Sequence, residues 1–165
     1  MEIKELKIDV KVCGYDELDA ERRRLVDKAR EMTRRSYAPY SKFHVGAAIE
    51  LADGTIIGGA NQENAAFSSG TCAERSACFY ASANHPGVAM KRIAIAAWTR
   101  LHHPEDAPDS DCFQPLPISP CGSCRQALLE YETLHGPMEV VLYGADKIYI
   151  LSSVASLLPL CFTEF

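Results

Sequence analysis

Residues 43–60 read FHVGAAIELADGTIIGGA, and this stretch predicts two strands joined by a tight turn. We expect the first strand over residues 43–51 and its partner over residues 55–60. Asp53-Gly54 between them is a strong β-hairpin signal, because the glycine accepts the positive φ angle that such a turn requires. An antiparallel hairpin is therefore expected at the start of the sheet.

The segments on both sides of this hairpin alternate between helical and extended patterns. We expect helices over 16–36, 72–83, 120 or 121 to 134, and 153–158, with Asp16 as the first N-cap. We expect further strands over 92–99, 139–143 and 147–151. Residues 1–13 alternate weakly and predict an extra strand or arm, and residues 102–117 predict a polar loop. One α/β domain over residues 1–165 fits this order.

The composition is that of a soluble globular domain. The chain has 165 residues, of which 47% are hydrophobic and 24% charged, and its formal net charge is -5. This acidic balance argues against a nucleic-acid partner, which normally requires a basic surface. No run of about 20 apolar residues predicts a membrane span, and the first residues do not resemble a signal peptide. Seven cysteines without a secretion signal favour the reducing cytoplasm, where cysteines more often bind metal or catalyse.

Two short segments carry the chemistry. Cys72 and Glu74 stand in Thr71-Cys72-Ala73-Glu74-Arg75, and Cys121 and Cys124 stand in Pro120-Cys121-Gly122-Ser123-Cys124. Three thiolates can hold one zinc ion and leave a coordination position open for water, as catalytic zinc sites do. A carboxylate two residues from one ligand can then move the proton of that water. The pattern predicts a hydrolytic zinc enzyme.

The sequence leaves two other roles open for these cysteines. Cys-x-x-Cys alone also occurs as a redox dithiol, although that motif needs neither Cys72 nor Glu74. A fourth protein ligand would instead give a closed structural zinc site, and Cys78 is the candidate. Six residues along a helix correspond to about 600° of rotation, which places Cys78 off the face of Cys72.

Three thiolates give a Zn²⁺ site a formal charge of -1, so a nearby cation would restore part of its Lewis acidity. Arg75 and Arg125 follow the two motifs directly. Either could donate a hydrogen bond to sulfur from outside the metal's own ligand set. For Arg75, which follows Glu74, we favour this hydrogen bond to sulfur over a role as a solvent-exposed surface charge.

Several motifs in the same order resemble the small, homotetrameric cytidine deaminases of the three-cysteine zinc type. The pairing of a cysteine-glutamate segment with Pro-Cys-x-x-Cys is characteristic of zinc nucleobase deaminases. The similarity runs over residues 36–162 and includes these further segments: Tyr37-Ala38-Pro39-Tyr40-Ser41-Lys42-Phe43, Val45-Gly46-Ala47-Ala48, Asn61-Gln62-Glu63-Asn64-Ala65 and Leu157-Leu158-Pro159.

This resemblance implies a three-layer α/β/α fold with a mixed five-stranded sheet, one Zn²⁺ per chain and a homotetramer with shared active sites. It implies a cytoplasmic enzyme of pyrimidine salvage that converts cytidine and 2′-deoxycytidine to uridine and 2′-deoxyuridine. The zinc ligands that it implies are Cys72, Cys121 and Cys124, and Glu74 is the implied proton shuttle.

The resemblance also implies a set of substrate contacts. Asn61 and Glu63 correspond to residues that bind the sugar hydroxyls, and the backbone amide of Ala73 to a partner of the pyrimidine carbonyl. Phe43 corresponds to an aromatic of the pocket. Phe162 corresponds to a C-terminal aromatic that stacks on the base bound by a neighbouring subunit.

The chain departs from the family pattern at four places. His44 replaces an expected proline, and Ala66-Phe67-Ser68 replaces Ser-Tyr-Gly. Residues 102–119 form a longer connection than usual, and residues 1–15 are an extra segment that could pack at an interface. Deamination of another cytosine nucleoside, such as an antibiotic, is the alternative function. A polynucleotide deaminase and a non-catalytic zinc domain are less favoured.

Overall fold

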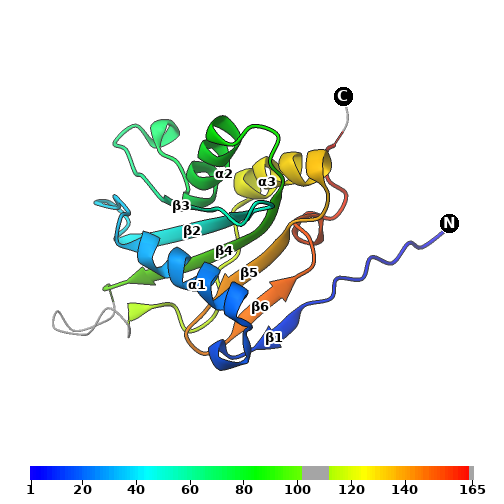
Figure 1. Ribbon diagram of the computed structural model, residues 1–165, viewed down its shortest axis with the longest axis horizontal. Coiled ribbons are helices and arrows are strands. Elements are labelled where there is room, and N and C mark those ends of the chain that lie inside the picture. The colour runs from blue at the N-terminus through cyan, green and yellow to red at the C-terminus, as the bar shows by residue number, and fades with distance from the viewer. Residues whose placement is uncertain (102–111, 164–165) are drawn as a thin grey trace.

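The computed structural model describes residues 1–101 and 112–163, and it contains one mixed sheet covered by helices on both faces (Figure 1). The strands are β1 (Lys11–Cys13), β2 (Phe43–Leu51), β3 (Ile56–Ala60), β4 (Met90–Thr99), β5 (Glu139–Tyr143) and β6 (Ile148–Leu151). The helices are α1 (Ala20–Thr33), α2 (Ala73–Asn84) and α3 (Gly122–His135). Residues 102–111 of the expected loop lie outside the described residues.

The sheet has the order β1-β6-β5-β4-β2-β3, and β4 and β5 are its parallel pair. The remaining neighbours are antiparallel, including the predicted β2–β3 hairpin. The expectation of five strands was wrong, because Lys11–Cys13 adds a sixth strand beside β6. The prediction of a mixed sheet in an α/β/α arrangement is confirmed.

Side-chain size on the two faces of the sheet determines how the helices pack. Successive residues of a strand point to opposite faces. Small residues such as Ala48, Ala94 and Ala96 face α1, where Leu25 and Val26 are fully buried. The larger Ile49, Ile93 and Ile95 belong to the other face, whose core includes buried residues of both α2 and α3. Helices α2 and α3 therefore share one layer, opposite α1 (Figure 1).

The helices begin later than the sequence predicts. Asp16 lies in a 3₁₀-helix at Tyr15–Glu17, and Asp19 is the true N-cap of α1 through a hydrogen bond from Arg22 N at 2.8 Å. Helix α3 begins at Gly122, so Pro120 precedes the helix and its cap. The expected last helix is a 3₁₀-helix at Ala155–Leu157. In the described part of the chain, no helix is long and apolar enough to cross a membrane.

Candidate metal centre and adjoining pocket

The three motif cysteines come together at the N-termini of two neighbouring helices. Cys72 is the N-cap of α2 and Cys121 is the N-cap of α3, and both have extended backbone angles. Neither side chain caps its own helix, so both sulfurs are available to another partner. Cys124 lies in the first turn of α3 and is buried. Helix N-termini stabilise anions, so this arrangement favours thiolates.

The sulfur atoms are spaced as ligands of one ion. Cys72 Sγ lies 3.9 Å from Cys121 Sγ, and Cys121 Sγ lies 3.5 Å from Cys124 Sγ. All three sulfurs lie within 4.8 Å of one another. With Zn–S bonds of about 2.3 Å, two ligands of a tetrahedral site lie about 3.8 Å apart. The spacing of the group therefore fits the ligands of a single zinc ion.

Among the described residues, no fourth histidine, cysteine or carboxylate joins this group. The Cys78 thiol, the candidate closing ligand, is buried and donates to the carbonyl of Arg75 at 3.6 Å. Burial raises the pKa of Cys78 to about 12, and its sulfur lies outside the group of three ligand atoms. Three protein ligands leave one position of a tetrahedral ion for water or substrate.

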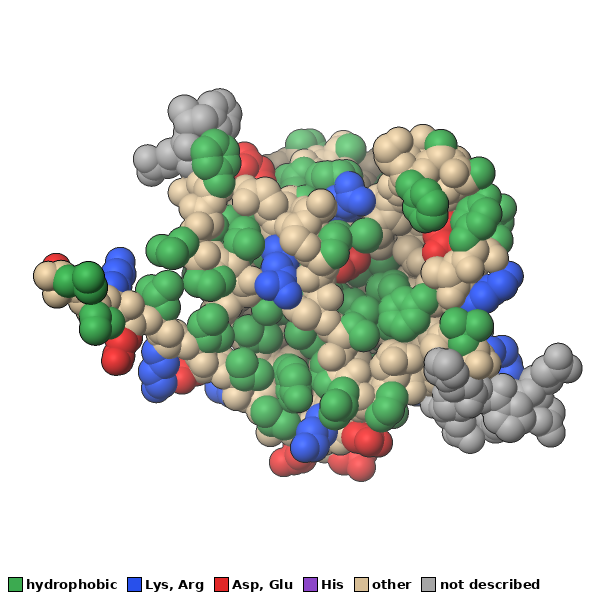
Figure 2. All heavy atoms as spheres, turned by 180° about the vertical axis from the view of Figure 1, so that it is seen from behind, with side chains coloured by type: hydrophobic (Ala, Val, Ile, Leu, Met, Phe, Trp, Pro, Cys, Tyr) green, Lys and Arg blue, Asp and Glu red, His purple; other side chains and the backbone are tan. Residues whose placement is uncertain are grey.

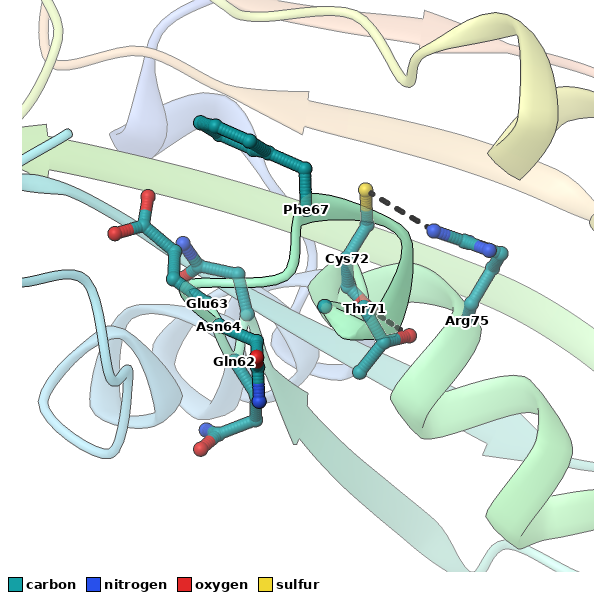
Figure 3. Close-up of a pocket in the computed structure, with 9 residues that line it drawn as sticks. Gln62, Glu63, Asn64, Phe67, Thr71, Cys72 and Arg75 are labelled. Atoms are coloured by element: carbon teal, nitrogen blue, oxygen red, sulfur yellow. Dashed lines mark hydrogen bonds between the residues drawn. The ribbon is translucent and has the colours of Figure 1, made fainter. Parts of the chain in front are cut away.

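Arg75 is the arginine that contacts the sulfur group. Its Nη2 lies 3.9 Å from Cys72 Sγ, and Figure 3 shows the sulfur and the guanidinium pointing toward each other. Hydrogen bonding from the Cys124 thiol, followed by that from Arg75, lowers the pKa of Cys72. Arg125 instead donates to the carbonyls of Pro120 and Leu157, at 2.8 and 2.7 Å. Arg75 is thus the arginine that contacts a sulfur, and Arg125 is the one that binds backbone carbonyls.

Glu74 is the second residue of α2, and its side chain is almost completely buried at 4% exposure. Burial is the main reason that its pKa is raised, and the charge of Cys72 adds to the effect. A carboxyl group with a raised pKa exchanges protons more readily near neutral pH than a solvated one. Its position beside two sulfur ligands suits proton transfer next to the metal centre.

A cavity of about 250 Å³ adjoins Cys72 and is lined in part by residues of the segment after β3 (Figure 3). Its lining consists of Asn61, Gln62, Glu63, Asn64, Phe67, Gly70, Thr71, Cys72 and Arg75. The structure therefore brings the predicted sugar-binding residues and one sulfur to the same cavity. The contributions of Asn64 and Thr71 were missed, although both flank a motif residue in sequence.

Asn61 and Glu63 are held in place by the segment before β2 and by the first residues of β2 rather than by each other. Asn61 Oδ1 accepts hydrogen bonds from Ser36 Oγ and Val45 N, and its Nδ2 donates to the carbonyl of Phe43. Glu63 Oε2 accepts from the backbone amides of Tyr40 and Ser41, at 2.9 and 3.2 Å. These bonds hold both residues in the lining of the cavity.

Four of the residues predicted for catalysis or substrate binding are not part of this cavity lining in the described chain: Phe43, Ala73, Glu74 and Phe162. Ala73 and Glu74 are buried directly after Cys72, so they lie next to the metal centre instead. Phe43 is half-buried at the start of β2. Phe162 is 64% exposed near the C-terminus, and its carbonyl accepts a hydrogen bond from Gln126.

Comparisons with known proteins agree with this geometry. Residues 19–140 match the family model described as the cytidine and deoxycytidylate deaminase zinc-binding region. A cytidine deaminase of Sporosarcina psychrophila is 37% identical over 142 residues, which cover 86% of this chain and 90% of the relative. A probable cytidine deaminase of Dictyostelium discoideum is 34% identical and covers 84% of this chain and 82% of its own.

Solved structures show the same fold. The crystal structure of a cytidine deaminase from Burkholderia pseudomallei has a TM-score of 0.66 and 36% identity, covering 84% of this chain and 97% of its own. A cytidine deaminase from Mycobacterium tuberculosis has a TM-score of 0.65 and 26% identity, covering 88% of this chain and 100% of its own. By its sequence, fold and cluster of three cysteines, this chain belongs to the cytidine and deoxycytidylate deaminase zinc-binding family.

Proposed function

We propose that this protein is a zinc-dependent hydrolase that deaminates cytidine and 2′-deoxycytidine to uridine and 2′-deoxyuridine, with release of ammonia. The observation that carries this proposal is the three-sulfur group beside the buried Glu74 and the cavity of Asn61 and Glu63. A structural zinc site would need neither a buried carboxyl group nor an adjoining cavity. The deaminase names of the relatives support the same activity.

Cys72, Cys121 and Cys124 are the proposed ligands of one Zn²⁺ per chain. A bound zinc ion would lower the pKa of water and so supply hydroxide near neutral pH. Glu74 takes the proton released from that water and transfers it to N3 of the cytosine ring. Once the water oxygen has added to C4 of the ring, Glu74 takes the proton of the new C4 hydroxyl group and transfers it to the amine. The C4–N bond then breaks, the C4 carbonyl of the uracil ring forms, and ammonia leaves as the neutral molecule. Arg75 balances the negative charge of the sulfurs through Cys72.

The remaining proposed contacts orient the nucleoside. Glu63, held by two backbone amides, and Asn61 bind the sugar hydroxyls at the cavity. The amide of Ala73 lies in the first turn of α2, where backbone N–H groups have no partner within the helix and can bind the pyrimidine carbonyl. Phe43, half-buried at the start of β2 and outside the cavity lining, is the proposed aromatic contact of the nucleoside.

Phe162 is the residue through which we propose that subunits share active sites. Its side chain is 64% exposed, and we propose that it stacks on a base bound by a neighbouring copy in a homotetramer. Dissociation to monomers is then expected to remove activity. A protein that is monomeric by light scattering and still fully active would contradict the sharing of active sites. We further propose a cytoplasmic location, since Cys72, Cys121 and Cys124 form no disulfide. We also propose one deaminase domain over residues 1–165.

A turnover assay on purified protein tests the reaction itself. We expect cytidine and 2′-deoxycytidine to lose their ultraviolet absorbance while ammonia and the uracil nucleoside appear in equal amounts. Cytosine and cytidine monophosphate are expected to react more slowly, because the first lacks the sugar and the second adds a phosphate. Protein that contains one zinc per chain but converts none of the four compounds would reject the proposed function.

A further inference from the structure

Residues 1–10 form an N-terminal arm that leads away from the body of the molecule into β1 (Figure 1). Figure 2 shows this arm projecting with hydrophobic, basic and acidic side chains in close succession. Its apolar residues are exposed, with Leu6 at 51%, Ile8 at 44% and Val10 at 43%. Apolar side chains at every second position of a projecting segment indicate a surface that another chain covers.

The arm lies outside the region that the family model matches. The family match begins at residue 19, after β1. The solved structures are matched over 97% and 100% of their own chains while they cover 84% and 88% of this one. This chain therefore contains residues that those structures lack, and the arm precedes the shared region.

Strand β1 provides the place where a second chain can add. Its inner edge pairs antiparallel with β6, from Lys11 opposite Ile150 to Cys13 opposite Ile148. In the described part of the chain no strand pairs with the outer edge of β1. The N–H and C=O groups of such an edge form a template for one more strand.

We infer that residues 3–13 pair antiparallel with the same segment of a second copy, around a twofold axis at Ile8. In this register Lys7 lies opposite the partner's Asp9, and Glu5 lies opposite the partner's Lys11. On the other face Leu6 lies opposite the partner's Val10, and the two copies of Ile8 meet. Twofold symmetry doubles every unlike pair, so four ion pairs flank an apolar centre.

Neighbouring registers of the same pairing are less complementary. An axis at Asp9 places like charges opposite each other, since Lys7 then faces the partner's Lys11. An axis at Lys7 opposes two copies of Lys7 and sets Glu5 against the partner's Asp9. An axis at Val10 retains only the pairs between Asp9 and Lys11. Opposite charges across strands stabilise a pair and like charges destabilise it, so the sequence selects Ile8.

The geometry of the arm agrees with this register. Lys7 Nζ lies 3.2 Å from Asp9 Oδ1, with the two side chains 86% and 83% exposed. Both charges therefore point to the same side of the arm, as the cross-strand pairs require, and neither is engaged by the body of the protein. The inference does not depend on the proposed deamination, because no residue of the arm belongs to the metal centre or the cavity.

Disulfide formation in the full-length protein tests the axis. Opposed side chains of an antiparallel pair have Cβ atoms about 4.5–5.5 Å apart. Ile8→Cys is therefore expected to cross-link two chains under mild oxidation, as seen on a non-reducing gel. Val10→Cys is the matched control, because in this register it faces Leu6 of the partner subunit. The unmodified chain gives the background from the native cysteines. Equal or faster cross-linking by Val10→Cys would overturn the inference.

Charge reversal tests whether the contact lies between two arms. Lys7→Glu or Asp9→Lys is combined with Ile8→Cys in one chain. Either change places like charges opposite each other at positions 7 and 9 of the two arms and is expected to slow cross-linking about tenfold. Mixing the two variants restores opposite charges between arms, and a mixed product identified by mass is expected at the original rate. Each chain in the mixture still carries like charges at both positions, so rescue cannot arise within one arm. Failure of the mixture to cross-link would reject the inference.

Discussion

Glu74 is the residue whose role is most sharply defined by its surroundings. Its carboxyl group is buried two residues after Cys72, a proposed zinc ligand, yet it is not one of the three grouped ligand atoms. Glu74→Gln keeps the size and burial of the side chain but removes the proton carrier. We expect unchanged zinc content and a loss of about 10²–10⁴-fold in kcat, the usual contribution of general acid–base catalysis. Zinc analysis and the cytidine assay check both, and a variant with nearly full turnover would eliminate the shuttle role.

Arg75 and Arg125 allow a matched comparison at the two motifs. Arg75 contacts a sulfur, whereas Arg125 contacts backbone carbonyls. We expect Arg75→Gln to weaken zinc binding about 10–100-fold, the usual effect of losing an outer-shell partner. Arg125→Gln is expected to lower the free energy of unfolding with less effect on zinc affinity. Competition with a chelator and urea unfolding measure the two quantities. Equal zinc affinity in the two variants would contradict the assignment.

The metal-centre residues could be predicted from sequence because their chemistry is local. Cys72 and Glu74 are fixed by two-residue spacing on one helix, and Cys121 and Cys124 by a single helical turn. Contacts between distant segments were harder to foresee. Asn61 uses both ends of its amide to hold the segment from Ser36 to Val45. This contact depends on how a loop folds over β3. No periodic pattern encodes that contact.

At the scale of elements, the start of α1 shows how a capping residue sets a boundary. Asp16 and Asp19 both precede the apolar pattern, and sequence alone favoured the wrong one. The structure selects Asp19, whose carboxylate accepts a hydrogen bond from Arg22 N, while residues 15–17 turn separately as a 3₁₀-helix. The interiors of strands and helices were predicted correctly, because burial on one face repeats along them. Their ends depend on single hydrogen bonds, which composition does not reveal.

Asp19→Ala is therefore expected to lower the free energy of unfolding by about 1 kcal/mol at neutral pH, the usual cost of losing an N-cap. The hydrogen bond from Arg22 N is the main cause that lowers the pKa of Asp19. A lowered pKa in the folded state means that the stabilisation is present at neutral pH and is lost as the pH falls through that pKa. The difference from the parent protein should then shrink in acid. Urea unfolding at several pH values measures it. Asp16→Ala is the control, and an equal loss there would contradict the cap assignment.

At the scale of the whole molecule, the separation between layers is set by glycines on adjacent positions of β3. Gly59 faces α2, and a Cβ atom added there would lie 2.5 Å from the carbonyl oxygen of Ala73 and 2.6 Å from Ala77 N. Gly58 faces the opposite layer, and its added Cβ would lie 2.6 Å from Met32 Sδ. The first contact is with the backbone of the helix that carries Cys72, whereas the second is with the end of a flexible side chain.

These two glycines couple the packing of the layers to the metal centre, and their alanine variants separate the effects. Gly59→Ala is expected to push α2 away from the sheet and lower the free energy of unfolding by about 1–3 kcal/mol, as overpacking does. Because Ala73 follows Cys72 directly, the displaced helix should also weaken zinc binding and turnover. Gly58→Ala needs only a rotamer change of Met32, since methionine adapts readily, and should leave zinc affinity unchanged. Unfolding in urea and chelator competition compare the pair. If both variants bind zinc equally well, the position of α2 on β3 does not control the sulfur group.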